Sequence, residues 1–240
     1  MKILIACEES QAVCKEMRRL GHECYSCDII DQSGGHPEWH IMQDVLPLLN
    51  GNCTFKTMDG AEHTIDGKWD MIIAHPPCTY MSKAGARWMY SNGVLNQSRY
   101  LQALAARDFF LTILAADCSR ICVENPTPLK ILNLPLYTQV IQPYQFYGKF
   151  NSFSKRTLLW LKGLPALIPV NPVKPLSTLC PSSCSHFAGT DKNKGTKHSA
   201  MDRSRTPYGI ARAMAEQWAG QVEEGDNNEN QYMPMLRARI

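Results

Sequence analysis

The sequence has no apolar run long enough to cross a membrane, and its first ten residues hold too few apolar positions for the core of a signal peptide. We therefore expect a soluble, cytoplasmic protein without a membrane partner. An internal repeat is also lacking, which argues against a repeat array. At 240 residues, 44% of them hydrophobic, the chain is long enough for one α/β domain with a full core and a small appended lobe.

Acidic residues are scarce in one segment. Residues 149–205 hold 10 Lys and Arg but only 2 Asp and Glu, whereas residues 1–148 hold 12 against 15 and residues 206–240 hold 3 against 5. Such dense positive charge favours a polyanionic partner, most simply nucleic acid, although a solvated loop would show the same composition. The 10 cysteines are scattered through apolar segments, so we expect reduced thiols rather than disulfides.

Strand-like and helix-like segments alternate along the chain. Short apolar runs rich in β-formers predict strands, and apolar residues at helical spacing predict helices. We expect strands at 2–7, 23–28, 69–74, 120–125 and 157–161, a short strand before Asp44, a hairpin or connector at 53–68, and helices at 12–20, 99–116 and 206–220. This alternation indicates a Rossmann-like α/β fold, with a mostly parallel sheet flanked by helices.

Asp28 and Asp44 fall at expected strand ends, where the ligands of an open parallel sheet collect. Asp28 stands where a nucleoside-binding protein places a carboxylate for ribose hydroxyls, and Asp44 is suited to an adenine amino group. The loop after the first strand lacks a G-x-G-x-x-G fingerprint, which excludes a dinucleotide site of that type but not an adenosine-based methyl donor. The alternative for both carboxylates is ordinary capping of loops.

Cys78 and Glu124 also stand at strand ends. Two prolines restrict the backbone before Cys78 and present its thiol after the 69–74 strand, although most free cysteines are buried hydrophobes. Glu124, in "CVENP", ends the 120–125 strand within reach of the same pocket. A cysteine nucleophile and an acid for a ring nitrogen are the pair needed to attack C6 of a pyrimidine and so make C5 nucleophilic.

These motifs, in this order, resemble the C5-cytosine DNA methyltransferase family, most closely its compact phage and prophage members. "PPCTYMS" (76–82) is similar to the catalytic Pro-Cys motif, "VENP" (123–126) to the Glu-Asn-Val motif and "SKRTLLWL" (154–161) to the arginine motif. The segments similar to the S-adenosylmethionine motifs are "ILIACEES" (3–10), "CDI" (27–29), "QDV" (43–45) and "TPYGIARAMA" (206–215). The resemblance implies a class I methyltransferase fold, a bacterial cytoplasmic location, and a role in DNA modification such as restriction-modification.

The resemblance also implies roles for particular residues. Cys78 adds to C6 of a cytosine flipped out of double-stranded DNA, Glu124 engages N3 and Arg156 holds O2, so that C5 can take the methyl group. Residues expected to bind S-adenosylmethionine are Cys7, Glu8, Asp28, Ile29, Asp44, Val45, Pro76 and Gly209. Residues expected to bind DNA are Ser82, Lys83, Arg87, Lys155, Lys192, Lys194, Lys197, Arg203 and Arg205, with Lys83 and Arg87 on a lid over the target base.

The chain departs from the family in one segment. Only residues 162–202 lie where family members with defined recognition sites insert a recognition domain, so we expect short or relaxed sequence specificity. Cys180, Cys184, His186 and His198 have a spacing that fits zinc, but such pairs are common by chance and we expect no metal. The expected division is a catalytic core (1–162), a basic target-contacting lobe (163–202), a helix completing the core (203–220) and a disordered tail (221–240), in a monomer.

Alternatives stay open. An RNA-directed enzyme of the two-cysteine type would carry its nucleophile near Cys122, although the pattern around Glu124 favours Cys78. A free nucleotide would leave the basic segment without a purpose. A donor with an extra carboxylate would need a cation such as Arg203 or Arg205. A non-catalytic nucleic-acid-binding relative would not need the Cys78 and Glu124 pair, which is present.

Overall fold

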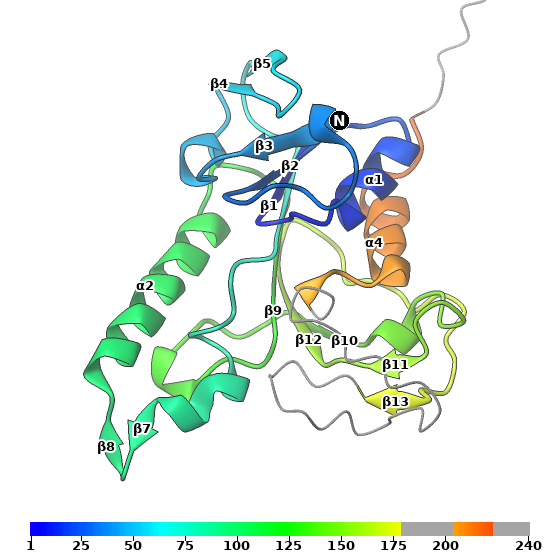
Figure 1. Ribbon diagram of the computed structural model, residues 1–240. Coiled ribbons are helices and arrows are strands. Elements are labelled where there is room, and N and C mark those ends of the chain that lie inside the picture. The colour runs from blue at the N-terminus through cyan, green and yellow to red at the C-terminus, as the bar shows by residue number, and fades with distance from the viewer. Residues whose placement is uncertain (179–203, 223–240) are drawn as a thin grey trace, which may run out of the picture.

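A seven-stranded sheet forms the centre of the protein (Figure 1). The computed structural model describes residues 1–178 and 204–222. The strands lie in the order β10-β12-β9-β6-β1-β2-β3. Their bounds are β1 Lys2–Ala6, β2 Glu23–Asp28, β3 His40–Met42, β6 Met71–Ala74, β9 Ile121–Asn125, β10 Gln139–Ile141 and β12 Thr157–Lys162. The five neighbours from β3 to β9 are parallel, whereas β12 runs antiparallel to both β9 and β10.

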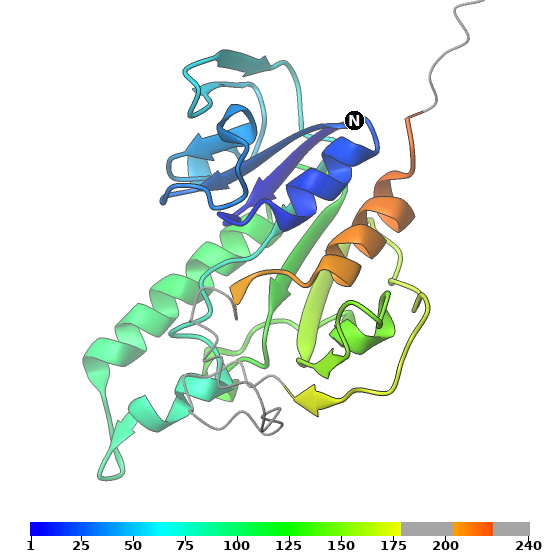
Figure 2. The same ribbon diagram turned by 45° about the vertical axis from the view of Figure 1, so that its right-hand side comes forward.

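Helices cover both faces of this sheet (Figures 1 and 2). Their bounds are α1 Ala12–Arg19, α2 Gln97–Leu114 and α4 Tyr208–Met214, and the π-helical turn η6 Ala215–Ala219 continues α4. The side chains of β1 alternate between the two layers. Ile3 and Ile5 pack in the apolar cluster that contains α1 and α4. Leu4 packs in the cluster on the α2 face, so β1 is buried from both sides.

The helices form and dock for reasons visible in the sequence. In α1, Val13 and Met17 recur at helical spacing and are fully buried against the sheet. Gly21, with φ of 86°, takes the left-handed conformation that ends the helix. In α2, Phe110 packs edge to face on Trp160 of β12, with ring centroids 5.0 Å apart. This contact fixes α2 against its face of the sheet.

Short elements surround the sheet. Within the described residues the two-stranded ribbons are β4 Cys53–Lys56 with β5 Glu62–Ile65, β7 Tyr90–Ser91 with β8 Val94–Leu95, and β11 Phe153–Ser154 with β13 Ser177–Thr178. Single 3-10 segments are η1 Pro37–Trp39, η2 Leu46–Leu48, η3 Lys83–Trp88, η4 Lys130–Leu132 and η5 Pro143–Gln145. The η3 segment and the β7–β8 ribbon lie between the Pro-Cys motif and α2, where the lid was expected.

The α/β class and the mostly parallel sheet are confirmed. All the expected strands and helices are present, and the 53–68 segment is the β4–β5 hairpin. In the central sheet, the strand β10 and the antiparallel direction of β12 were not predicted, and neither were the small β7–β8 and β11–β13 ribbons outside it. No helix in the part of the chain that the structure describes is long and apolar enough to span a membrane.

Candidate active site

The carboxyl ends of the parallel strands meet at one edge of the sheet. The strand order reverses between β1 and β6, and such a switch point is where open α/β sheets bind their ligands. Cys7 directly follows β1, and His75 directly follows β6. Glu124 is the last residue but one of β9. The fold therefore brings the N-terminal loop, the Pro-Cys segment and the end of β9 to one place.

His75 and Glu124 face each other across β6 and β9. The parallel register pairs Ala74 with Val123, so the next residues come level with one another. Nδ1 of His75 lies 3.6 Å from Oε2 of Glu124, and the two side chains are only 10% and 20% exposed. Thr206, just before α4, places its hydroxyl 3.5 Å from the same nitrogen. Nε2 of His75 is buried without a partner among the described residues. The sequence pattern gave His75 no role, and the structure makes it part of the site.

The neighbours His75 and Lys155 favour the carboxylate form of Glu124. Burial by itself raises the pKa of Glu124, but the contact with His75 and the charge of Lys155 outweigh burial and lower the pKa below its usual value. An ionised carboxylate only accepts hydrogen bonds. Glu124 must therefore receive a proton before it can donate one to a ring nitrogen.

The Cys78 backbone forms a tight turn after β6. The backbone N–H groups of Met81 and Ser82 both donate to the Cys78 carbonyl, at 3.1 and 2.9 Å. The N–H of Lys83 donates to the Thr127 carbonyl at 2.7 Å, which ties the turn to the segment after β9. The Cys78 side chain is thus presented from a loop that is anchored at both of its ends.

The Cys78 thiol is protonated in the free protein. Burial, and then the negative charge of Glu124, raises the pKa of Cys78, while the charge of Lys155 acts in the opposite direction. These influences show that the thiol, the carboxylate and the ammonium group lie within electrostatic reach of one another. A thiol at this site becomes a nucleophile only after it passes on its proton.

Lys155, rather than Arg156, is the cation of this cluster. Both residues precede β12, and successive side chains of an extended segment point to opposite faces. Lys155 lines the same small cavity as His75 and Glu124. Arg156 is exposed, and its Nη2 lies 3.5 Å from the Tyr137 hydroxyl. The structure thus places Lys155, which was expected on DNA, beside Glu124, and leaves Arg156, which was expected at the base, exposed.

A cavity of about 10 Å³ lies over the His75 and Glu124 pair. This is roughly the space that one water molecule needs. Its lining comes from the ends of β6 and β9, the start of β12, α4 and the segment that leads into α4. It consists of His75, Glu124, Lys155, Thr157, Ser204, Thr206, Pro207, Ile210 and Met214. A nucleobase is far larger than this cavity. The segment 204–207 would have to move for a base to reach Glu124.

Three predicted cofactor residues gather beside β1 and β2. Burial, followed by the negative charges of Asp28 and Asp44, raises the pKa of Cys7, so the three side chains lie close together. Asp28 is partly buried, which raises its own pKa, and Asp44 is exposed. Ile29, next to Asp28, is 75% exposed. Carboxylates for hydroxyl and amino groups beside an open apolar side chain fit an adenosine group.

Other predicted cofactor residues are built into the protein instead. Glu8 is 3% exposed, and its two oxygens accept the backbone N–H groups of Val13 and Cys14 at 2.7 and 3.2 Å, so Glu8 caps α1. A Cβ on Gly209 would lie 1.9 Å from the Phe146 carbonyl oxygen, so close packing requires this glycine. Val45 and Pro76 are buried as well. These four residues are thus part of the packed protein beneath the strand ends.

The predicted DNA contacts fall into three groups. Lys83 and Arg87 are exposed on η3, as expected of a lid. Ser82 is 5% exposed, and Arg205 contacts the loops after β1 and β2, with Nη2 2.9 Å from Ser33 Oγ and Nε 3.9 Å from Glu9 Oε1. Neither placement is that of an open DNA contact. The predicted DNA contacts Lys192, Lys194, Lys197 and Arg203, and the candidate zinc ligands Cys180, Cys184, His186 and His198, lie outside the described residues.

No protein-family model and no curated protein matches the chain.

Proposed function

We propose that the protein transfers a methyl group from S-adenosylmethionine to C5 of a cytosine in DNA. The observation that carries this proposal is that Cys78, after β6, and Glu124, at the end of β9, lie near enough for the charge of Glu124 to raise the pKa of Cys78. A thiol and a carboxylate so placed are the groups that must act on C6 and N3 of a pyrimidine. The cofactor, when bound, supplies an electrophilic methyl group.

In the free site Cys78 is a thiol and Glu124 is a carboxylate. These forms suit an addition of the thiol to C6 in which the thiol proton ends on N3 and no proton is gained or lost overall. Sγ of Cys78 bonds to C6, the C5–C6 π electrons move to C5, and the thiol proton passes through the Glu124 carboxylate to N3. C5 then takes the methyl group. Loss of the C5 proton and return of the N3 proton let the Sγ–C6 bond break, which restores the thiol. The addition and the elimination each use Glu124 once as an acceptor and once as a donor, and the C5 proton leaves to water.

His75 and Lys155 set the starting point of this cycle. Both lower the pKa of Glu124 and so keep it ready to accept the thiol proton. Lys155 also favours the thiolate form of Cys78. The Lys155 ammonium is a donor that suits the carbonyl oxygen of a base at this position. His75 is therefore a positioning residue that acts through Glu124.

The fold agrees with the proposal. The order β3-β2-β1-β6-β9 is that of a doubly wound nucleotide-binding sheet. The antiparallel strand β12, inserted between β9 and β10, is typical of class I methyltransferases. The gathering of Cys7, Asp28 and Asp44 at the carboxyl ends of β1 to β3 supports placing the adenosine part of the donor there.

The geometry disfavours an RNA-directed enzyme, a free-nucleotide enzyme and a non-catalytic binding protein. Cys122, the nucleophile expected in an RNA enzyme of the two-cysteine type, is fully buried, and burial raises its pKa well above its usual value. It is poorly suited to attack a base. A free nucleotide would not use the exposed cations Lys83 and Arg87 of the lid. A binding protein without activity would not need a thiol and a carboxylate in one cluster.

Nucleoside mass spectrometry tests the proposal directly. DNA incubated with the protein and S-adenosylmethionine should yield 5-methylcytosine, and the Cys78→Ser variant should yield none. DNA containing 5-fluorocytosine should trap a covalent adduct on Cys78, because the C5 fluorine cannot leave as a proton does. Absence of 5-methylcytosine with intact cofactor binding would reject the substrate or the donor. An adduct that survives Cys78→Ser would reject the nucleophile.

A further inference from the structure

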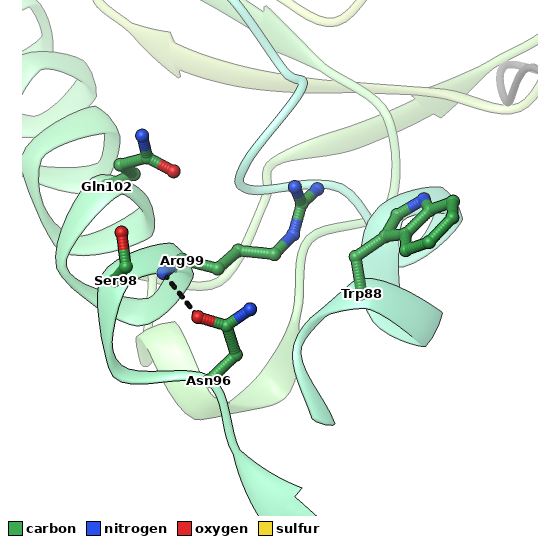
Figure 3. Close-up of a pocket in the computed structure, with 5 residues that line it drawn as sticks. All are labelled: Trp88, Asn96, Ser98, Arg99 and Gln102. Atoms are coloured by element: carbon green, nitrogen blue, oxygen red, sulfur yellow. Dashed lines mark hydrogen bonds between the residues drawn. The ribbon is translucent and has the colours of Figure 1, made fainter. Parts of the chain in front are cut away.

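A second cavity opens at the start of α2, away from the Glu124 cluster. Its volume is about 310 Å³, at the small end of the range of ligand sites, and its lining is Trp88, Asn96, Ser98, Arg99 and Gln102. Figure 3 shows Arg99 extending from α2 toward the segment that carries Trp88. The lining thus combines one aromatic ring with hydroxyl, amide and guanidinium groups.

The chain segment around this cavity carries unbalanced positive charge. Residues 71–106 contain Lys83, Arg87 and Arg99 and no Asp or Glu. The stretch covers the nucleophile turn, η3, the β7–β8 ribbon and the first half of α2. Such a surface attracts a phosphate backbone, and this attraction weakens as the salt concentration rises.

Trp88 offers a stacking surface at the mouth of the cavity. Its side chain is 56% exposed, and the Arg87 guanidinium lies 4.7 Å from its ring centroid. Exposed aromatic rings beside cations are the usual platform for unpaired bases. Asn96 uses its Oδ1 to cap α2 through the Arg99 N–H, and within the described part of the chain the side chains of Ser98 and Gln102 make no hydrogen bond. These groups are available to a base edge.

Arg99 connects the cavity to the nucleophile turn. Its Nη2 donates to the carbonyl of Thr79, the residue after Cys78, at 3.0 Å, and its guanidinium lies 5.0 Å from the centroid of the Tyr80 ring. Its Nε is buried without a partner among the described residues. A Cβ on Gly85 would lie 2.7 Å from Nη2, so the guanidinium is closely enclosed. A ligand that displaces Arg99 would therefore move the backbone beside Cys78.

We propose that this cavity binds one nucleobase next to the target cytosine, stacked on Trp88 and read by the Gln102 and Ser98 side chains. The inference rests on the proposed function for its substrate and adds the part of the protein that senses the neighbouring base. It gives a chain without a long recognition segment a local means of selecting sequence. Because Arg99 bridges the cavity and the turn, occupancy by the preferred base also positions the nucleophile.

Abasic scanning tests the proposal by binding alone. The probe is a short DNA duplex with one mismatched cytosine, the base most easily flipped, and one abasic site moved through the flanking positions. The parent protein should lose about tenfold in affinity when the abasic site occupies one particular flanking position. Trp88→Ala and Gln102→Ala should bind the intact duplex about tenfold more weakly and lose nothing further at that position.

Gln97→Ala is the matched control, because Gln97 is an exposed glutamine of the same helix that does not line the cavity. It should behave as the parent does. The proposal is overturned if the losses from Trp88→Ala and from the abasic site multiply at every position, or if Trp88→Ala binds as the parent. An RNA duplex of the same sequence shows which backbone is preferred. If the Trp88→Ala and abasic-site losses are not additive at one position but no 5-methylcytosine forms, the base-binding cavity is supported and the proposed reaction is rejected. If 5-methylcytosine forms but the losses are additive everywhere, the reaction is supported and the base-binding cavity is rejected.

Discussion

The imidazole of His75 and the carboxylate of Glu124 form one buried pair, with Nδ1 and Oε2 3.6 Å apart. The pair keeps Glu124 ionised, because the contact and the nearby Lys155 lower its pKa despite burial. The same carboxylate, together with burial, keeps Cys78 protonated. In the free protein the nucleophile and its acid are thus both in the wrong form for attack on a base. Transfer of one proton from Cys78 to Glu124 gives both the thiolate nucleophile and the carboxylic acid that attack on a base requires.

Replacing His75 should change the pH dependence of methyl transfer. In His75→Gln the imidazole interactions that lower the pKa of Glu124 are lost while its burial remains, so the pKa of Glu124 rises. Activity needs the ionised carboxylate and is lost as pH falls through this pKa. The acid limb of kcat/KM should therefore move to higher pH, and a move of about one pH unit lowers kcat/KM roughly tenfold on the acid side.

His63→Gln provides the control for that profile, since His63 lies on β5, outside the Glu124 cluster. Its acid limb should match that of the parent protein. His75→Lys places an ammonium group at the position and should restore part of the profile. An unchanged acid limb in His75→Gln, with the protein folded, would show that His75 does not control Glu124.

Lys155 and Arg156 should differ sharply in their importance. Lys155→Met removes the cation that lines the Glu124 cavity and should lower kcat about a hundredfold, the usual size of a lost electrostatic contact to a reacting group. Arg156→Met changes an exposed side chain and should lower kcat less than tenfold. Steady-state kinetics on one DNA substrate compare the two. Greater damage from Arg156→Met would restore the assignment drawn from the motif.

Much of the fold was predictable because each central strand has a clear signal in its own short stretch of sequence. The runs that became β1, β6 and β9 are short, apolar and rich in β-branched residues, as strands buried on both faces are. The strand β10 was missed because it has three residues and begins with Gln139, and only pairing with β12 makes it a strand. Local pattern does not encode such a partner.

The site was predictable in its residue types more than in its contacts. Cys78 and Glu124 were found because both end strong strands. The motif did not predict that Lys155 rather than Arg156 lines the Glu124 cavity, because a one-residue difference in an extended chain exchanges the two faces of the sheet. His75 had no assigned role because its partner lies on another strand, and only the parallel register brings the two together.

Glu8 should matter for stability more than for the cofactor. In Glu8→Ala the N–H groups of Val13 and Cys14 lose their buried acceptors, which should lower the free energy of unfolding by about 1–3 kcal/mol. Glu8→Gln keeps one acceptor oxygen and should cost less. Urea unfolding measures both, and calorimetric titration with S-adenosylmethionine should show little change in affinity. A large loss of affinity in a stable Glu8→Gln protein would instead place Glu8 at the cofactor.

The reactivity of Cys78 toward iodoacetamide should respond in opposite directions to its two charged neighbours. Glu124→Gln removes the negative charge that raises the thiol pKa, so more thiolate forms at a given pH and alkylation should speed up. Lys155→Met removes the charge that lowers that pKa, so alkylation should slow. Peptide mass spectrometry follows Cys78 alone, with the fully buried Cys122 as an internal reference that stays unlabelled. Equal rates in both variants would mean that the thiol does not sense this cluster, and the proton path from Cys78 through Glu124 would then be untenable.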